Sequence, residues 1–363
     1  MKIAYLIHWN EGPESGVFKK VVEQMTEWRK LSHEVALFLF TSRPDIAWGE
    51  YAPGITCFVS HYSGRSGRFK AFSQLAQSVR EWEPDAIYHR FDLYYGPLPS
   101  LLRAYPSVLE INTNDLSEMR MEKGLRYYYH RLTRGLVLKA ASGFVFVSEE
   151  LASEPHFKRY VRNYTTIGNG IRLDDYGSST PLAASSSVRF VFIGSAGQSW
   201  HGIDEMAALA DARPDWQFDM IGSDADELTR PAPDNMHFHG KLCRTQYQSL
   251  MDSADIAIGT LALHRKGMNE ASPLKVREYL ANGLPVIIGY RDTDFAAVVP
   301  FLLELPNEAD NIVKRLEAID AFAARWKGRR VDRESLGHLD TAVKEAQRVD
   351  YMNRIASAKG KRQ

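Results

Sequence analysis

Residues 269–287, NEASPLKVREYLANGLPVI, carry two glutamates eight positions apart, with a proline and a lysine between them. Pro273 suits the start of a helix, and the free N–H groups of a first helical turn point outward. Such a helix start can bind a phosphate, and Lys275 can add a full positive charge beside it. Glu278 can accept hydrogen bonds from ribose hydroxyls, as acidic residues do in dinucleotide-binding folds, and Glu270 in the preceding loop can meet a sugar.

The alternative for this pair of acids is an ordinary solvated helix face, because two glutamates at this spacing often occur by chance. The context favours a binding function, since Ser272, Pro273, Leu274 and Lys275 stand together at the helix start. A Gly-x-Pro stop at 283–285 then leads directly into an apolar run.

Other polar residues show weaker patterns. Gly12 and Gly16 follow the first apolar run, but no complete Gly-x-Gly-x-x-Gly is present, so they form either a turn or a ligand contact. Asp224-Ala225-Asp226 has the Asp-x-Asp form of some metal sites, and Asp292-Thr293-Asp294 is similar. We interpret both as loop and helix-cap acids. The histidines share no metal-ligand spacing, so we expect no metal.

The elements that position these residues alternate between short apolar runs and helical patterns. Runs at 3–7 and 35–40 predict buried strands, whereas Val17, Val21 and Met25 recur at helical spacing. Strands alternating with helices predict parallel sheets with right-handed crossovers. The predicted fold class is therefore α/β, and ligands of such sheets bind beyond the carboxyl ends of the strands.

The chain is long enough for two domains of ordinary size. A polar, turn-rich stretch at 176–187 predicts a linker. The first Rossmann-like domain is expected at 1–175, and a second, similar in pattern, at 188–340. The two would face each other across a ligand-binding cleft. Residues 341–363 are predicted to form a C-terminal helix that can return to the first domain.

Composition excludes several classes of protein. Lys+Arg and Asp+Glu both number 45, so the formal net charge is zero, and we expect no nucleic-acid partner. Cys57 and Cys243 are the only cysteines, which suggests neither a disulfide framework nor a thiolate metal site and fits a reducing compartment. The first apolar run is too short for a signal peptide, and no later run approaches a membrane span. These features predict a cytoplasmic protein.

The 269–287 stretch resembles the Glu-x7-Glu signature of retaining glycosyltransferase family 4, in its Ser-Pro-Leu-Lys-x-x-Glu-Tyr-x-Ala-x-Gly-x-Pro-Val form. Other landmarks resemble the family in the same order, at 145–148, 167–171, 192–194, 200–202, 220–222 and 239–240. The resemblance covers nearly the whole chain. It implies a GT-B fold, a nucleotide-diphosphate sugar as co-substrate, hexose transfer with retention at the anomeric carbon, and no required metal or cofactor. The acceptor would be a glycan or a lipid-linked molecule, as in polysaccharide or glycolipid biosynthesis.

The same resemblance implies roles for individual residues. Glu270, Lys275 and Asn112 are the candidate catalytic residues, and Glu278 would hold the ribose. The remaining candidate donor-binding residues lie mainly at strand ends and at the helix start: Ser272, Pro273, Leu274, His201, Gly194, Gly240, Leu242 and Gly16. Backbone groups near Gly240 and Leu242 would contact the base.

Three positions depart from the family pattern. Ser195 and His201 stand where many members carry an Arg and a Lys that face the diphosphate, and Asn112 stands where many carry a His. Lys275 and helix N-termini would then neutralise more of the diphosphate charge. Donor affinity would be weaker or pH-sensitive. Asn112 can hydrogen-bond a sugar hydroxyl but cannot shuttle a proton, so the leaving phosphate would act as the base toward the acceptor.

Residues 120–139 carry six basic residues among three tyrosines. A basic, aromatic helix in a neutral protein suits an anionic membrane surface, with Arg126, Arg131 and Arg134 as docking residues and the protein peripheral on the inner face. The alternative is a solvated helix with its aromatic side chains in the core. Two other functions remain open, a GT-B-type sugar-nucleotide epimerase and a non-catalytic sugar-nucleotide-binding subunit.

Overall fold

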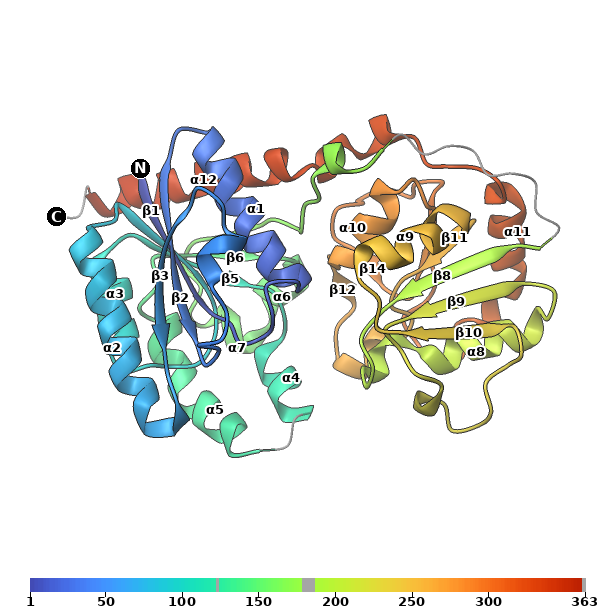
Figure 1. Ribbon diagram of the computed structural model, residues 1–363, viewed down its shortest axis with the longest axis horizontal. Coiled ribbons are helices and arrows are strands. Elements are labelled where there is room, and N and C mark those ends of the chain that lie inside the picture. Colours follow the sequence, from blue (N-terminus) through green and yellow to red (C-terminus); the bar gives the residue numbers. More distant parts are fainter. Residues whose placement is uncertain (122–123, 178–186, 361–363) are drawn as a thin grey trace. The chain divides into compact units, whose positions relative to one another are not determined.

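The structure is a computed structural model that describes residues 1–121, 124–177 and 187–360 (Figure 1). The chain divides into two compact units. Unit 1 comprises Met1–Gly168 and Thr341–Gln363, and unit 2 comprises Asn169–Asp340. The first unit therefore ends at Gly168 and not at 175, and most of the stretch predicted as a linker, 178–186, lies outside the described residues. The C-terminal helix belongs to unit 1.

Unit 1 contains a seven-stranded sheet of order β3-β2-β1-β4-β5-β6-β7, in which all neighbouring strands are parallel. Its strands are β1 (Lys2–His8), β2 (Glu34–Thr41), β3 (Thr56–His61), β4 (Ala86–Arg90), β5 (Ser107–Ile111), β6 (Gly143–Phe146) and β7 (Tyr164–Thr166). Its helices are α1 (Gly16–Lys30), α2 (Gly64–Trp82), α3 (Leu98–Ala104), α4 (Asp115–Met121), α5 (Leu125–Leu138), α6 (Glu149–Ser153), α7 (Pro155–Lys158) and α12 (Thr341–Gly360), with the 3₁₀ turn η1 (Trp48–Tyr51). The strand order reverses between β1 and β4, and such a switch point is where open α/β sheets bind ligands.

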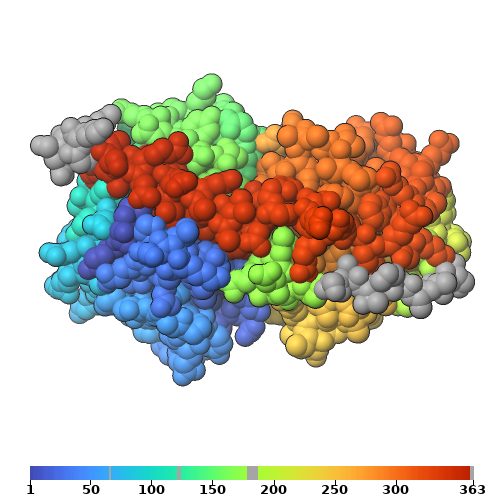
Figure 2. Space-filling view, turned by 90° about the horizontal axis from the view of Figure 1, so that it is seen from above, coloured from blue at the N-terminus to red at the C-terminus, as the bar shows by residue number. Residues whose placement is uncertain are grey.

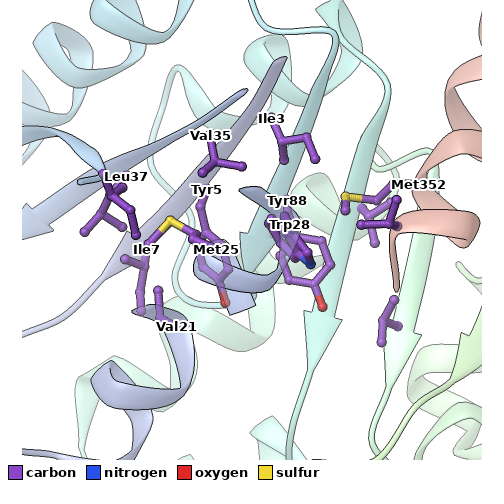
Figure 3. Close-up of a cluster of buried hydrophobic side chains, with 14 of the residues drawn as sticks. Ile3, Tyr5, Ile7, Val21, Met25, Trp28, Val35, Leu37, Tyr88 and Met352 are labelled. Carbon is purple, nitrogen blue, oxygen red and sulfur yellow. The ribbon is translucent and has the colours of Figure 1, made fainter. Parts of the chain in front are cut away.

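One face of this sheet packs against α1 and α12. Helix α1 begins after Ser15, whose hydroxyl oxygen accepts a hydrogen bond from the backbone N–H of Phe18 at 3.2 Å. Alternate side chains of β1 and β2 point toward α1 because the side-chain period of a strand is two. Figure 3 shows the resulting core, which includes Ile3, Tyr5, Ile7, Val21, Met25, Trp28, Val35, Leu37, Tyr88 and Met352. Helix α12, red in Figure 2, lies beside the blue α1, and Glu345 of α12 accepts a hydrogen bond from the Trp28 indole at 2.9 Å.

The opposite face of the unit 1 sheet packs against α2. Phe38 and Phe40 of β2 point this way, and the Phe40 ring meets Phe72 of α2 edge-on, with the ring centroids 5.4 Å apart. Both faces of the sheet are therefore covered, as the continuous apolar runs of its central strands require.

Unit 2 contains a six-stranded parallel sheet of order β10-β9-β8-β11-β13-β15 and a short parallel pair, β12-β14. Its strands are β8 (Arg189–Ile193), β9 (Gln217–Ile221), β10 (Met236–Gly240), β11 (Ile256–Ile258), β12 (Glu270–Ala271), β13 (Val286–Ile288), β14 (Arg291–Asp292) and β15 (Leu302–Glu304). Its helices are α8 (Ile203–Ala212), α9 (Arg244–Ser253), α10 (Leu274–Ala281) and α11 (Leu316–Trp326). Short 3₁₀ turns complete the unit: η2 (Leu173–Asp175), η3 (Ser199–His201), η4 (Ala225–Glu227), η5 (Leu263–Lys266), η6 (Val313–Arg315) and η7 (Arg333–Leu339).

The core of unit 2 lies between this sheet and the helices α8 and α11. Met206 and Leu209 of α8 and Ile319 of α11 are fully buried against Phe190 and Ile256 of the sheet. Helices α9 and α10 lie on the other face (Figure 1). The strand order of this sheet reverses between β8 and β11, so the loops after these two strands form the expected ligand edge. Among the described residues, no helix is both long and apolar enough to cross a membrane.

Candidate functional site

The ligand edge of unit 2 is built around closely packed glycines at the ends of β8 and β9. The N–H of Gly194 donates to the carbonyl of Ile221 at 2.8 Å, and the N–H of Gly222 donates to that of Gly240 at 2.7 Å. A Cβ on Gly222 would lie 2.2 Å from the Gly194 oxygen, and one on Gly194 would lie 2.5 Å from the Phe192 ring. Only glycine therefore allows these strand ends to approach each other and leaves their backbone open to a ligand.

Lys275 and His201 lie against the same aromatic ring at this edge. The Lys275 Nζ lies 4.4 Å from the centroid of the Phe192 ring, and the His201 ring meets Phe192 edge-on, with centroids 5.2 Å apart. The Lys275 Nζ and the His201 Nδ1 are both buried, and neither makes a hydrogen bond within the described part of the chain. Two unsatisfied polar atoms on one wall indicate a place where a polar ligand completes the hydrogen bonding.

The two side chains differ in their protonation. Burial lowers the pKa of Lys275 to about 7. Burial, and then the nearby charges of Lys275 and Lys266, lower the pKa of His201 to about 2. His201 is therefore neutral at physiological pH and can donate a single hydrogen bond, while Lys275 is the group that titrates near neutrality. The sequence predicted that His201 would make donor affinity pH-sensitive. These pKa values assign that sensitivity to Lys275 instead.

Helix α10 presents Lys275 from a turn that is fixed by a buried arginine. Pro273 is the N-cap of α10, and Leu274 is its first residue. Arg277 is completely buried and donates to both carboxylate oxygens of Asp292, at 2.7 Å each, and to Asp294 at 2.5 Å. It also donates to the Ser272 hydroxyl at 2.8 Å.

Ser272 itself is saturated by protein contacts. Its hydroxyl oxygen also accepts from the backbone N–H of Asn169 at 2.8 Å and donates to Asp294 at 3.2 Å. The Ser272 carbonyl also accepts from the Asn169 side-chain amide, so Ser272 supports the turn and its side chain is not free for a ligand. The sequence interpretation of Asp292 and Asp294 as simple loop and cap acids missed their ion pairs with Arg277. In contrast, Asp224 forms the expected cap, a capping box with Glu227.

Glu278 lies one turn further along α10 with its side chain 18% exposed. One carboxylate oxygen accepts a hydrogen bond from the Tyr247 hydroxyl at 2.7 Å, and the Arg244 Nε lies 4.0 Å away. Burial, followed by the charge of Glu278, raises the pKa of Tyr247, so its hydroxyl remains a donor. Tyr247 therefore fixes one oxygen of Glu278 and leaves the other for hydroxyl groups of a ligand.

The remaining residues of unit 2 that the sequence singled out lie in β12, at the end of β10 and in the loops after β8 and β10. Glu270 is half-buried in β12, where it stands opposite Arg291 of β14. Gly240 ends β10 with φ +62°, a conformation that glycine adopts without strain, and Leu242 lies half-buried in the following loop. Ser195 is exposed directly after Gly194. Among the described residues, no group of three or more His, Cys, Asp or Glu side chains is placed to hold a metal ion.

Asn112 and Gly16 belong to unit 1. The side-chain Oδ1 of Asn112 accepts from the Lys20 ammonium at 3.2 Å, and the same ammonium donates to Glu110 at 2.9 Å. The Asn112 Nδ2 is buried and makes no hydrogen bond to a described residue. Burial lowers the pKa of Lys20 to about 8, although Glu110 opposes this effect. Gly16 is the exposed first residue of α1.

Sequence reasoning missed a polar cluster at the switch point of the unit 1 sheet. His8 ends β1 and Asp92 follows β4, and the His8 Nδ1 lies 2.5 Å from an Asp92 oxygen. The His8 Nε2 lies 2.8 Å from the Tyr62 hydroxyl, the Tyr95 hydroxyl donates to Asp92 at 3.0 Å, and Arg68 donates to Tyr95 at 3.1 Å. Burial acts to raise the pKa of Asp92, but His8 holds it well below its usual range. The only signal in the sequence was that His8 stands at the end of one predicted strand and Asp92 shortly after another.

Helix α5 differs from both interpretations of the basic segment. Arg134 is 1% exposed and donates to Asp115 at 2.6 and 2.9 Å, so it is a buried ion-pair partner and the docking role predicted for it is wrong. Arg126 and Arg131 are exposed. The alternative of a helix with its aromatics in the core is also wrong, because Tyr128 is 62% exposed.

The chain resembles proteins of known class. Residues 187–319 match the family model described as Glycosyl transferases group 1. Sucrose-phosphate synthase from Thermosynechococcus elongatus is 14% identical, with a TM-score of 0.63 over 99% of this chain and 97% of that one. Anabaena HepE in complex with UDP-glucose is 16% identical, with a TM-score of 0.66 over 98% and 100%. The lipopolysaccharide outer core galactosyltransferase WaaB is 12% identical, with a TM-score of 0.66 over 99% and 100%.

Comparison with curated protein sequences finds no match. At such low identities the solved structures establish the fold alone, which is the two-sheet GT-B architecture expected from the 269–287 signature. The family model covers most of unit 2, including Gly194, His201, Lys275 and Glu278. The chain therefore contains a glycosyl transferases group 1 domain and has the fold of the GT-B glycosyltransferases.

Proposed function

We propose that this protein is a retaining glycosyltransferase that moves a hexose from a nucleotide-diphosphate sugar to a glycan or lipid-linked acceptor without a metal. The observation that carries the proposal is the buried Lys275 ammonium, which has no hydrogen-bond partner among the described residues and lies against the same ring, Phe192, as His201. A buried cation without a partner is unfavourable, and a diphosphate supplies the missing anion. The UDP-glucose complex of Anabaena HepE makes UDP-glucose the first donor to test.

The proposed reaction assigns a role to each part of the site. The bond from the anomeric carbon to the diphosphate oxygen breaks, the acceptor oxygen bonds to the same face, and the acceptor proton passes to the leaving phosphate. Negative charge on the diphosphate rises in this step. Lys275 and the free N–H groups at the start of α10 therefore stabilise the transition state more than the ground state. Glu278 holds the ribose, Glu270 borders the hexose, and Asn112 hydrogen-bonds a sugar hydroxyl.

A thermal-shift screen with UDP-, GDP- and ADP-glucose in a chelator tests donor binding. A donor at about a hundredfold its Kd should add about 2.7 kcal/mol of stability. Lys275→Ala should lower turnover about a hundredfold, equivalent to about 2.7 kcal/mol, with a smaller effect on donor affinity. Lys314→Ala, which removes an exposed lysine of unit 2, serves as the matched control. Turnover that requires added Mn²⁺ or Mg²⁺ would show that the metal-independent mechanism is wrong.

Donor hydrolysis separates this proposal from its two rivals. A transferase slowly releases free sugar from its donor when no acceptor is present. A non-catalytic binding subunit would be stabilised by the donor and release nothing. An epimerase would return a changed sugar nucleotide without any acceptor.

We also propose that the protein acts in the cytoplasm and docks on the inner membrane surface through α5. Leu125, Tyr128 and Leu132 are 78%, 62% and 82% exposed, and their spacing places them on one side of this helix. The exposed Arg126 and Arg131 flank them, as expected of an interfacial amphipathic helix. Cys57 and Cys243 are free thiols, which fits a reducing compartment. The variant Leu125→Ser/Leu132→Ser should sediment less with anionic vesicles, and unchanged binding would refute the docking role.

A further inference from the structure

A pocket of about 470 Å³ opens between α4, α5 and α7 of unit 1. This volume lies within the range of small-molecule sites in proteins. Its polar lining is almost entirely cationic or aromatic and includes Arg120, Tyr127, Arg131, Arg134, His156 and Arg159. Four guanidinium groups around one hollow are unusual in a chain whose formal net charge is zero.

Most of this positive charge is not neutralised by the protein. Arg134 is paired with Asp115 at 2.6 Å. Arg120, Arg131 and Arg159 are exposed, and none of these three forms an ion pair within the described ranges of the chain. The planar guanidinium fork pairs with carboxylate and phosphate alike. Three such groups around one pocket, however, match the three terminal oxygens and the higher charge of a phosphomonoester, whereas a carboxylate has two oxygens and one charge.

The buried pair gives the pocket a fixed floor. Asp115 also accepts from His130 at 2.5 Å, and Arg134 donates to the backbone carbonyl of His156 at 3.0 Å. The Arg134 guanidinium lies 4.8 Å from the centroid of the Phe157 ring. These contacts join α4, α5 and α7 before any ligand binds. A site that is already assembled loses less conformational entropy on binding.

A second hollow, of about 720 Å³, shares three lining residues with the first: Arg120, Tyr127 and Arg131. Its remaining lining includes Leu125 and Tyr128, two of the exposed apolar residues of α5. Arg120 and Arg131 thus line both hollows, and the second hollow adds the apolar surface of Leu125 and Tyr128. A ligand with an anionic head and an apolar chain has the matching chemistry.

We propose that the arginine pocket binds the phosphate group of a membrane lipid, a phosphomonoester or a diphosphate, whose apolar part lies along Leu125 and Tyr128. The inference rests on the proposed membrane docking and names the lipid chemistry that α5 recognises. It differs from general charge attraction because three arginines around one pocket can all bond to the terminal oxygens of a phosphate, whereas a carboxylate offers only two oxygens.

Vesicle sedimentation tests this distinction. Phosphatidylcholine vesicles are doped with either phosphatidic acid or oleate to the same surface charge, and wild type should bind the phosphate vesicles at least tenfold more tightly. The variant Arg120→Lys/Arg131→Lys/Arg159→Lys keeps the charge but loses the fork, and should lose this preference. The matched control Arg29→Lys/Arg80→Lys/Arg103→Lys changes exposed arginines of unit 1 outside the pocket and should bind like wild type. Equal binding to both vesicles, or a pocket variant that binds like wild type, would overturn the proposal.

Two further measurements distinguish a lipid ligand from a free phosphate, and distinguish failure of this proposal from failure of the proposed transferase function. If the natural ligand is a free phosphate, soluble diphosphate will bind wild type more tightly than the arginine-to-lysine pocket variant, and Leu125→Ser/Tyr128→Ser will retain wild-type affinity for phosphatidic acid vesicles. That result would overturn the lipid assignment. Donor-induced thermal shifts are recorded for every variant, and wild-type values in the pocket variants show that they are folded. Absence of any donor shift in the wild type counts against the proposed transferase and leaves the pocket result standing.

Discussion

The chemistry of unit 2 depends on one lysine in an apolar setting. The ammonium of Lys275 lies over the Phe192 ring, and His201, which contacts the same ring, is neutral. Burial disfavours the charged form of a lysine, and the pKa of Lys275 falls to about 7 for this reason. The side chain is therefore divided between its neutral and cationic forms at neutral pH, and an anionic ligand shifts it to the cation.

We expect donor affinity to fall as the pH rises above about 7. The donor diphosphate favours the cation, so binding raises the pKa of Lys275 and takes up a proton. Below pH 7 the lysine is already charged and the affinity is constant. Between pH 7 and the pKa in the complex, affinity should fall about tenfold per pH unit. Calorimetry from pH 6 to 9, in buffers of different ionisation enthalpy, measures the proton uptake. Lys275→Met should abolish it, and a flat wild-type profile would contradict the prediction.

A second prediction at this scale concerns the contact between Tyr247 and Glu278. Glu278→Ala removes the carboxylate that would accept from two ribose hydroxyls, each bond contributing roughly 1.5–3 kcal/mol, so the donor Kd should rise more than a hundredfold. Tyr247→Phe removes only the hydrogen bond that orients the carboxylate and should weaken binding by about tenfold or less. Gln248→Ala, which changes a neighbour on α9, is the control. A Glu278→Ala variant with a donor Kd within twofold of wild type would refute the ribose role.

The sequence predicted much of this site because its signature is local. Glu270, Pro273, Lys275 and Glu278 fall within nine consecutive residues, so their spacing alone placed them on one loop and one helix. It did not predict that the Lys275 ammonium is buried, because the Phe192 ring that covers it lies 83 positions earlier. The His8–Asp92 contact was missed for the same reason, since it depends on which strands are neighbours.

At the scale of elements, the turn that precedes helix α10 is fixed by the Arg277 side chain. Arg277 connects the helix to Asp292 and Asp294 after β13, and to Ser272 in the turn before the helix. The turn that presents Lys275 therefore depends on an arginine that does not itself face the ligand edge. This dependence explains why the Ser272 hydroxyl is saturated by protein contacts.

Removing the Arg277 guanidinium should destabilise unit 2 by about 3–5 kcal/mol, because Arg277→Met leaves buried carboxylates without their cation. Urea unfolding measures the loss. Arg277→Lys should recover part of it and still raise the donor Kd, since the guanidinium donates to four residues at once and an ammonium has only three donors. Adding Asp292→Asn to Arg277→Met should restore some stability. Full stability in Arg277→Met would show that the buried network contributes nothing.

Strong elements were predictable and weak ones were not. The buried central strands β1 and β2 and the amphipathic α1 follow directly from apolar runs and helical spacing. The residue patterns of β3 (Thr56–His61) and β7 (Tyr164–Thr166) do not predict strands. These two are the edge strands of unit 1. Both are only partly buried, so they lack the apolar pattern that marks a core strand.

At the scale of the whole molecule, helix α12 belongs to unit 1, together with residues 1–168. Helix α12 follows unit 2 in sequence, yet its Met352 lies in the unit 1 core and its Arg348 is fully buried there. Arg348 donates to Glu345 at 2.7 Å, lies 3.8 Å from Glu110 of β5, and donates to the carbonyl of Gly168 at 3.1 Å. Unit 1 is therefore incomplete until the last helix has been synthesised.

Arg348→Met should consequently destabilise unit 1 by about 3–5 kcal/mol and leave unit 2 unchanged. The substitution leaves Glu345 without its cation, whereas no hydrogen bond of residues 169–340 that involves described residues passes through Arg348. Hydrogen exchange followed by mass spectrometry resolves the two units and should show faster exchange only in residues 1–168 and 341–360. Arg354→Met changes an exposed arginine of the same helix and should have no effect. Arg348→Met/Glu345→Met should recover stability, because replacing both members of a buried ion pair by apolar groups is close to neutral. Equal acceleration in both units would show that the two fold as one cooperative body and that α12 does not belong to unit 1 alone.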